Sequence, residues 1–205
     1  KHNNPCGAAI SNTIEDAFNK ALACDPISAF GGIVALNKIV DVNTAKKLSD
    51  LFLECVVAPY FSEEALYILQ NKKNLRLLEL DLNNINYKNQ SSYKSILGGL
   101  LIQEADASED NNNEWELVTN KKPTDDEFKD LEFSWKICKH VKSNAIVISK
   151  NQQTIGIGAG QMNRVGAARI ALESAKSQSL GSVLASDGFF PFADSVEIAN
   201  KFGIK

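Results

Sequence analysis

The sequence contains no long hydrophobic run, no excess of positive charge and no cysteine pair spaced for metal binding. No apolar segment approaches the ~20 residues needed to span a bilayer, so we expect a soluble globular protein without a membrane partner. The 205 residues include 22 Lys and Arg against 25 Asp and Glu, which gives a formal net charge of −3. This composition argues against a general nucleic-acid-binding protein, which needs a basic face. The composition does not exclude small anionic substrates, because a few basic residues grouped in one site can bind them.

The four cysteines, Cys6, Cys24, Cys55 and Cys138, lie far apart in the chain. They form no C-x-x-C pair, and this spacing is typical of reduced thiols in a cytosolic protein rather than of a disulfide framework. The chain begins at Lys1 without an initiator Met or a signal-like segment. We therefore expect a cytoplasmic protein, and we expect Lys1 to follow a cut inside a longer chain.

The spacing of apolar residues predicts alternating helices and short strands. Residues 11–25 carry a helical stripe of apolar side chains, with Thr13 as a candidate N-cap. Further helices are expected at 42–54 and 62–72, and strands at 31–37, 55–59, 74–80 and 95–103. This alternation indicates an α/β architecture for a first unit, residues 1–103.

The composition changes after this unit. Residues 104–116 hold six acidic residues, no basic residue and three consecutive Asn, so we predict an acidic linker or solvated loop over 104–123. Thr124 opens a TDDE pattern that resembles a capping box, which predicts the first helix of a second unit, 124–205. A hairpin over 144–160, a helix over 163–176, a strand over 182–190 and a helix over 194–205 are expected to follow.

The run GIGAGQ resembles part of a dinucleotide-binding motif. Gly156 and Gly158 supply the first two glycines of G-x-G-x-x-G, but the third position is Gln161, so the fingerprint fails. Both glycines follow β-branched residues. We therefore expect them inside a strand that another backbone or a ligand approaches closely.

The opening residues resemble, in part, the zinc deaminase signature H-x-E followed by P-C-x-x-C. Asn4 stands at the Glu position after His2, and Ala9 stands where a second Cys should follow Cys6. One thiol and one imidazole cannot complete a tetrahedral zinc shell. No zinc is therefore expected at this turn.

Lys1 and His2 lie on a turn rich in Asn, Pro and Gly that leads toward the first helix. A lone His is more often structural than catalytic, but His beside Lys, near backbone N–H donors, is an arrangement that acyl or formyl transfer requires. Two other polar stretches interrupt apolar segments: residues 142–144 precede a predicted strand, and Asp187 lies within the predicted strand 182–190. Each of these three places is a weak signal by itself.

Six segments together resemble a known family. They are KHNNPCG, CDPISAFGGIVALN, VVAPYFSEEAL, KSNAIV, IGIGAGQMNRVGAA and LASDGFFPFADSVEIA, and they are distributed over residues 1–199. In this order they resemble the formyltransferase part of the AICAR transformylase/IMP cyclohydrolase family. The resemblance implies tandem cytidine-deaminase-like, three-layer α/β/α units without the catalytic metal. It also implies that this chain is an incomplete fragment, without the IMP cyclohydrolase domain.

The reaction that the resemblance implies is formyl transfer from 10-formyl-tetrahydrofolate to the 5-amino group of AICAR, which gives FAICAR in IMP biosynthesis. This amine is a poor nucleophile because its lone pair is delocalised, so deprotonation must accompany its attack. By resemblance, His2 is the general base and Lys1 the transition-state stabiliser or proton donor on the folate side. Asn144 would hold the nucleotide, from the partner subunit of a homodimer with shared sites.

Further site residues follow only from the resemblance. Gly31, Glu54, Arg164 and Phe189 match nucleotide contacts of the family, and Val165 and Asp194 match its folate contacts. Glu54 stands where animal members have Asp. A potassium ion is implied near Asp187 and the backbone of residues 142–143.

Two other classes of function are alternatives to the enzyme. A non-catalytic nucleotide-binding module of the same fold would bind AICAR without turnover, whereas a zinc deaminase is disfavoured by its missing ligands. The resemblance also implies that basic nucleotide contacts lie outside residues 1–205. We therefore expect the isolated 205-residue chain to be inactive, and the activity to belong to the full-length parent.

Overall fold

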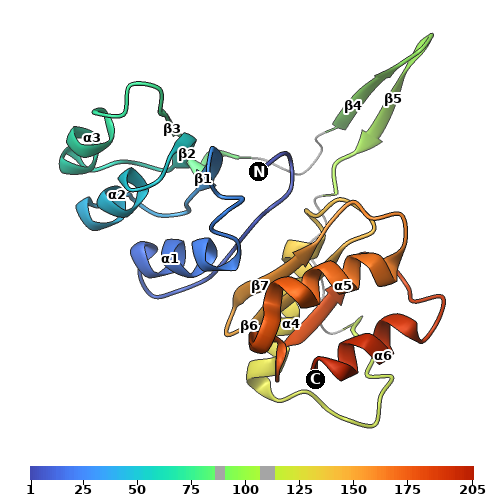
Figure 1. Ribbon diagram of the computed structural model, residues 1–205. Helices are drawn as coiled ribbons and strands as arrows, with labels where there is room; N and C mark the ends of the chain where they lie inside the picture. Colours follow the sequence, from blue (N-terminus) through green and yellow to red (C-terminus); the bar gives the residue numbers. More distant parts are fainter. Residues whose placement is uncertain (86–90, 107–113) are drawn as a thin grey trace.

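A computed structural model describes residues 1–85, 91–106 and 114–205 (Figure 1). Its helices and strands, with a parallel sheet in the first unit, confirm the predicted α/β class. The first unit contains α1 (Ile14–Cys24), β1 (Gly32–Ala35), α2 (Val42–Ser49), β2 (Leu53–Ala58), α3 (Glu63–Leu69), β3 (Arg76–Glu79) and the 3₁₀ helix η1 (Leu82–Asn84). A hairpin, β4 (Ser91–Ile96) and β5 (Gly99–Glu104), follows.

The second unit contains α4 (Asp125–Cys138), β6 (Ile146–Lys150), β7 (Gln153–Gly158), α5 (Arg164–Ala175), the 3₁₀ helix η3 (Lys176–Ser179), β8 (Val183–Ser186) and α6 (Asp194–Lys201). Among the residues described, no helix combines the length and the apolar character needed to cross a membrane.

A parallel sheet in the order β1-β2-β3 forms the centre of the first unit. The strand register aligns Val34, Val56 and Leu77 across the sheet, and these side chains pack in one cluster with apolar residues of α1, α2 and α3. On the opposite face, Ile33 and Leu78 are 65% and 54% exposed. Within the described part of the chain, this unit therefore buries one face of its sheet.

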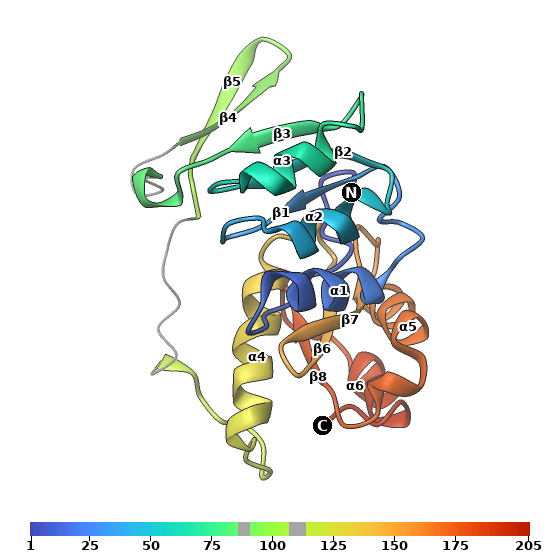
Figure 2. The same ribbon diagram turned by 90° about the vertical axis from the view of Figure 1, so that its left-hand side faces the viewer.

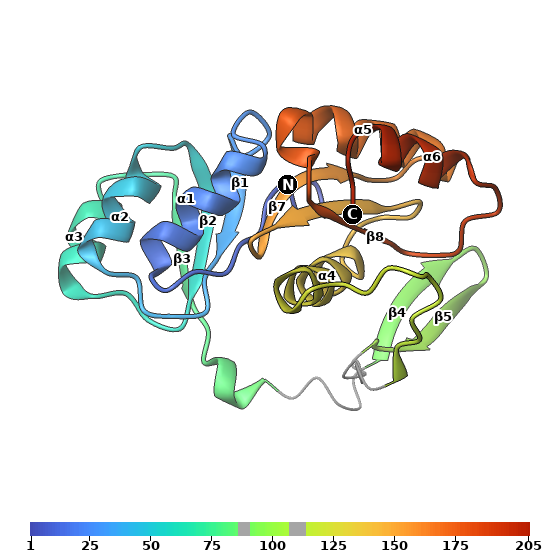
Figure 3. The same ribbon diagram turned by 90° about the horizontal axis from the view of Figure 1, so that it is seen from below.

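The second unit is a three-layer α/β/α sandwich (Figure 3). Its sheet has the order β7-β6-β8, and both strand pairs are antiparallel. Because successive side chains of a strand point to opposite faces, Val147 packs with Cys138 of α4, whereas Ile146 and Ile148 pack with the alanines of α5. Ile198 of α6, with Phe202 and Ile204 after it, completes the second of these layers.

Gly156 and Gly158 allow α5 to approach β7 closely. A Cβ at Gly156 would lie 2.0 Å from the carbonyl oxygen of Ala171, and one at Gly158 would lie 1.9 Å from that of Ala167. Neither distance is compatible with a side chain, so only glycine fits at both positions. The predicted close approach of a backbone to this strand is confirmed.

Two predicted helix starts are confirmed by their caps. The Thr13 side chain accepts a hydrogen bond from Asp16 N at the start of α1. At α4, Thr124 and Glu127 form a reciprocal capping box, with Thr124 N donating to Glu127 Oε2 over 2.8 Å. This backbone hydrogen bond, followed by the contact with Lys205, lowers the pKa of Glu127.

Some predicted boundaries were wrong. The strand expected at 95–103 instead contains the last two residues of β4, the turn, where Gly98 adopts φ +78°, and most of β5. The helix expected over 42–54 ends at Ser49, because β2 begins at Leu53, and the strand expected over 182–190 ends at Ser186.

The predicted linker over 104–123 begins inside β5, which ends at Glu104. Residues 107–113 of this predicted linker lie outside the described residues, and residues 115–123 form neither helix nor strand.

Residues 8–10 join the two units by pairing with the edge of β7. Ala8 and Thr154 exchange hydrogen bonds, with Thr154 N donating to Ala8 O over 3.0 Å and Ala8 N donating to Thr154 Oγ1 over 2.9 Å. Ile10 N donates to Gln152 O over 2.9 Å. Directly after this segment, α1 packs beside β7 (Figure 2). The opening residues are therefore held between the two units.

We predict that Gly158→Ala lowers the free energy of unfolding by about 1–3 kcal/mol, because the added Cβ must displace α5 from β7. The matched control is Gly99→Ala, since a Cβ at Gly99 in β5 would meet its nearest atom at an ordinary 3.7 Å. Urea unfolding of both variants measures the effect. Equal losses in the two variants would contradict the prediction.

Candidate functional site

The opening turn presents His2 on the surface. His2 and Asn3 both take positive φ angles, 49° and 62°, and Asn4 N closes the turn by donating to Lys1 O over 3.0 Å. The His2 side chain is exposed. The imidazole therefore stands on a short, hydrogen-bonded turn and is open to a ligand.

The Lys1 side chain is fixed against the first sheet. Its Nζ donates to Phe30 O over 2.5 Å and to Gly31 O over 3.2 Å. Gly31 adopts φ +65°, and a Cβ there would lie 3.1 Å from Lys1 Nζ. A side chain at position 31 would be both strained and crowded. The structure therefore brings together three of the predicted site residues, Lys1, His2 and Gly31.

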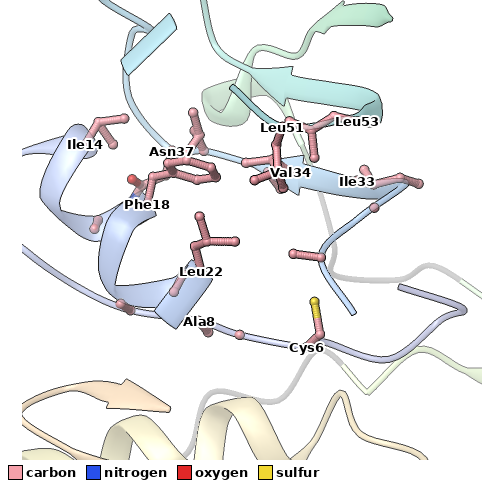
Figure 4. A pocket seen from close by; sticks show the side chains of 18 of the residues that line it. Cys6, Ala8, Ile14, Phe18, Leu22, Ile33, Val34, Asn37, Leu51 and Leu53 are labelled. Atoms are coloured by element: carbon pink, nitrogen blue, oxygen red, sulfur yellow. The ribbon is translucent and has the colours of Figure 1, made fainter. Parts of the chain in front are cut away.

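Two cavities adjoin this turn. The first has a volume of about 250 Å³, and its lining includes Lys1, His2, Cys6, Cys24 and Asp25. The second has a volume of about 410 Å³, lies between α1 and β1, and is lined mainly by apolar side chains (Figure 4). Cys6 lines both cavities, so it separates the polar turn from the apolar space.

The donor set at the turn does not fit zinc. Burial, the largest effect, raises the pKa of Cys24 to about 11. Cys6 and Cys24 are both free. Within the described ranges, no group of three His, Cys, Asp or Glu side chains could hold a metal ion.

The segment 142–144 lies against the opening turn. Lys142 N donates to Asn4 Oδ1 over 2.9 Å, although the two residues are far apart in the chain. Asn144 is fixed by its backbone N and its Nδ2, which donate to Gln161 O over 3.1 and 2.8 Å. Lys142 thus contacts the turn that carries Lys1 and His2. The predicted site residue Asn144 follows Lys142 by two residues in the sequence.

Arg164 and Asp187 form the most buried ion pair of the site. Arg164 Nη1 lies 2.5 Å from Asp187 Oδ1 and 2.8 Å from Ser186 Oγ, and the two side chains of the ion pair are 12% and 17% exposed. Asp187 Oδ1 also accepts a hydrogen bond from Ala145 N over 2.9 Å. The pair therefore links the start of α5 to the end of β8 and to the residue after Asn144.

Burial alone would raise the pKa of Asp187. The hydrogen bonds from Ser143, Ala145 N and Arg164, with the charge of Arg164, outweigh that effect and lower the pKa. The potassium ion implied near Asp187 would have to share this carboxylate with the guanidinium. Because Arg164 already neutralises the carboxylate, the donor set does not favour a second cation, and the potassium site stays a prediction.

The other predicted residues are more dispersed. Glu54 pairs with Arg76 over 3.0 Å, Phe189 is 82% exposed, and Asp194 Oδ1 accepts a hydrogen bond from Ser195 N over 2.7 Å at the start of α6. Val165 is the second residue of α5. Over the described ranges, none of these four predicted residues has a hydrogen bond or ion pair to Lys1, His2 or Asn144.

Asn4 is the residue whose role the sequence did not reveal. The sequence analysis singles out Asn4 only because it stands where a zinc deaminase has Glu. In the structure, the carboxamide of Asn4 joins the opening turn to segment 142–144. No local signal marks this role, because the partner lies in the other unit.

Comparison with known proteins gives consistent matches. The family described as AICARFT/IMPCHase bienzyme matches residues 1–174. The whole chain is 64% identical to the bifunctional purine biosynthesis protein PurH of Prochlorococcus marinus (strain AS9601) and 55% identical to that of strain MIT 9211. The chain spans about 40% of the length of each of these relatives.

We predict that Asp187→Asn lowers the free energy of unfolding at pH 7 by about 1–3 kcal/mol, because Arg164 loses its charged partner. A carboxylate whose pKa is lowered by folding stabilises the protein above its unfolded pKa of about 3.9, and this contribution is lost as the pH falls through the lowered value. The difference between wild type and variant should therefore shrink below about pH 4.

Urea unfolding at several pH values measures this difference. The control is Asp126→Asn, whose partner Lys129 is 3.0 Å away and whose side chain is 90% exposed; we expect a loss of about 0.5 kcal/mol or less. A pH-independent difference for Asp187→Asn would contradict the assignment of the effect to its charge.

Proposed function

Because this chain belongs to the AICARFT/IMPCHase bienzyme family, we propose that it carries a formyl-transfer site of the whole protein. The site transfers a formyl group from 10-formyl-tetrahydrofolate to the 5-amino group of AICAR and produces FAICAR for IMP biosynthesis. The observation that carries this proposal is the opening turn, where the carbonyl oxygens of Phe30 and Gly31 hold Lys1 Nζ and the exposed His2 lies beside a cavity. The four free thiols support a cytoplasmic location.

In the proposed reaction, the AICAR amine attacks the formyl carbon while His2 accepts a proton from that amine. A C–N bond forms to AICAR, the bond between the formyl carbon and folate N10 breaks, and N10 takes up a proton. His2 suits this role because its exposed imidazole stands on the turn beside the cavity, and an imidazole can accept a proton near neutral pH.

Lys1 stabilises the negative charge that develops on the formyl oxygen or donates the proton to folate N10. An ammonium group has three N–H donors, and two carbonyl oxygens, those of Phe30 and Gly31, hold Lys1 Nζ in place. One donor remains for the reacting groups. Because the charge is positioned in advance, little reorganisation is needed when the transition state forms.

Asn144 holds AICAR by the carboxamide oxygen that its own contacts leave available. Its Nδ2 donates to Gln161 O, which fixes the orientation of the amide and leaves Oδ1 as an acceptor for an N–H of the substrate. We also propose a homodimer with shared sites, in which Asn144 of one subunit serves the AICAR bound at the His2 of the other.

The remaining assignments are part of the same proposal. Arg164 keeps N–H donors beyond the Nη1 that binds Asp187, and its place at the start of α5 puts them near the positive end of a helix. These features support a contact with an anionic group of AICAR. Contacts of AICAR with Gly31, Glu54 and Phe189, and of the folate with Val165 and Asp194, complete the site.

We predict that His2→Ala in the whole protein lowers kcat for formyl transfer by about 10²- to 10⁴-fold, the usual contribution of a positioned acid–base group. The affinity for AICAR should fall less than kcat. The matched control is His140→Ala, which removes the other exposed histidine and should leave kcat unchanged. Steady-state kinetics and AICAR titration give both quantities.

Wild-type turnover in the His2→Ala protein would refute the assigned base. If the wild-type whole protein binds AICAR without formyl transfer, the chain is instead part of a non-catalytic nucleotide-binding module.

We predict that mixing His2→Ala and Asn144→Ala proteins restores part of the activity. In a homodimer with shared sites, a heterodimer places both defects in one site and leaves the other site intact. Up to half of the wild-type activity per heterodimer is then expected in a formyl-transfer assay, after subunit exchange has been verified with differently tagged subunits. Absence of recovery despite exchange shows that each site is built from a single chain.

A further inference from the structure

We propose that the β4–β5 hairpin is a dimerisation arm that docks on a second copy of this chain through the face that carries Tyr93, Leu100 and Ile102. The inference rests on the homodimer of the proposed function for the identity of the partner. It adds the surface that forms the interface.

The strand register divides the hairpin into two different faces. Tyr93 pairs with Ile102, and Ser95 pairs with Leu100; because directly opposed residues share a face of a sheet, the three large apolar side chains lie together. The other face combines the apolar Ile96 and Leu101 with polar residues. Its cross-strand pairs are Ser92 with Gln103, Lys94 with Leu101, and Ile96 with Gly99. The first face is therefore the one suited to contact with protein.

The hairpin lacks a covering partner within the described chain. In Figure 1 it projects away from both α/β units, and its two strands pack mainly on each other. Tyr93, Leu100 and Ile102 are 65%, 54% and 63% exposed. A two-stranded hairpin alone is at best marginally stable in water, so the apolar face needs a surface that covers it.

The exposed apolar area matches what a stable dimer needs. Tyr93, Leu100 and Ile102 expose an area on the order of 350 Å². Because a contact buries a comparable area on each partner, two reciprocal contacts bury on the order of 1,400 Å², and a stable interface buries about 1,200–2,000 Å² in total. In a two-fold symmetric dimer each arm docks on the other subunit, so the same contact forms twice. Two reciprocal arms supply enough area for a stable interface.

A second copy also offers a receiving surface of the same chemistry. On the uncovered face of the first sheet, the register aligns Ala35, Val57 and Leu78, and Ile33 and Leu78 on this face are 65% and 54% exposed. Two-fold exchange of the arms would cover both of these sheet faces as well as both arms. The same type of contact would thereby bury both exposed apolar surfaces of each subunit, the hairpin face and the sheet face.

The test is sedimentation velocity of the whole protein over a concentration series, with wild type compared with a Tyr93→Ser, Ile102→Ser double variant. We expect a wild-type dimer and at least a tenfold higher dimer dissociation constant in the variant. The control is Tyr67→Ser on α3, which removes an equally exposed tyrosine, 72% exposed, and should leave the dissociation constant unchanged. Circular dichroism verifies that each variant is folded.

If the double variant does not fold, Leu97→Ser tests the tip of the arm, because this side chain is fully exposed and has no role in the core. It should also weaken the dimer. A monomeric wild type, an unchanged dissociation constant in the folded variant, or a lower melting temperature with unchanged sedimentation would overturn the proposal. The last result would show that another part of the same subunit covers the arm.

Failure of the proposed function gives a different result. A wild-type dimer that dissociates in the double variant, but catalyses no formyl transfer, supports the arm and refutes the enzyme. An active wild type whose sedimentation is unaffected by the substitutions refutes only the arm.

Discussion

The pairing of residues 8–10 with the edge of β7 is the constraint on which the arrangement of the site depends. Hydrogen bonds between Ala8 and Thr154 and from Ile10 to Gln152 fix the opening segment to the second unit, while α1, which follows, belongs to the first. The turn of Lys1 and His2 is therefore held where the two units meet. Without this pairing, Asn4 would have no fixed position from which to accept the hydrogen bond of Lys142.

The close approach of α5 to β7 governs the other half of the site. Gly156 and Gly158 remove the side chains that would separate the two elements, and α5 consequently places Arg164, its first residue, within 2.5 Å of Asp187 after β8. Asp187 in turn binds Ala145 N beside Asn144. The close packing of α5 on β7 therefore determines the position of the Arg164–Asp187 ion pair.

Most helices were predictable because their signals are local. The cap at Thr13 and the capping box at Thr124 lie within three residues of the groups they bind, and the apolar stripe behind each cap supplies the buried face. The sequence predicts one strand in place of the hairpin because apolar residues stand on both sides of Gly98, where the turn lies. The predicted helix over 42–54 extends beyond α2 because Leu51 and Phe52 continue the apolar spacing up to Leu53, where β2 begins.

The sequence by itself determined the α/β class, the cap residues, the glycine pair that a backbone approaches, and the proximity of Lys1 to His2, because each depends on residue type and short spacing. Only the tertiary structure decided that Asn4 contacts Lys142, that Lys1 binds the carbonyl groups of Phe30 and Gly31, and that Arg164 neutralises Asp187. These contacts join residues that lie 23 to 138 positions apart. Their formation depends on the packing of whole helices and strands, which no short stretch of sequence encodes.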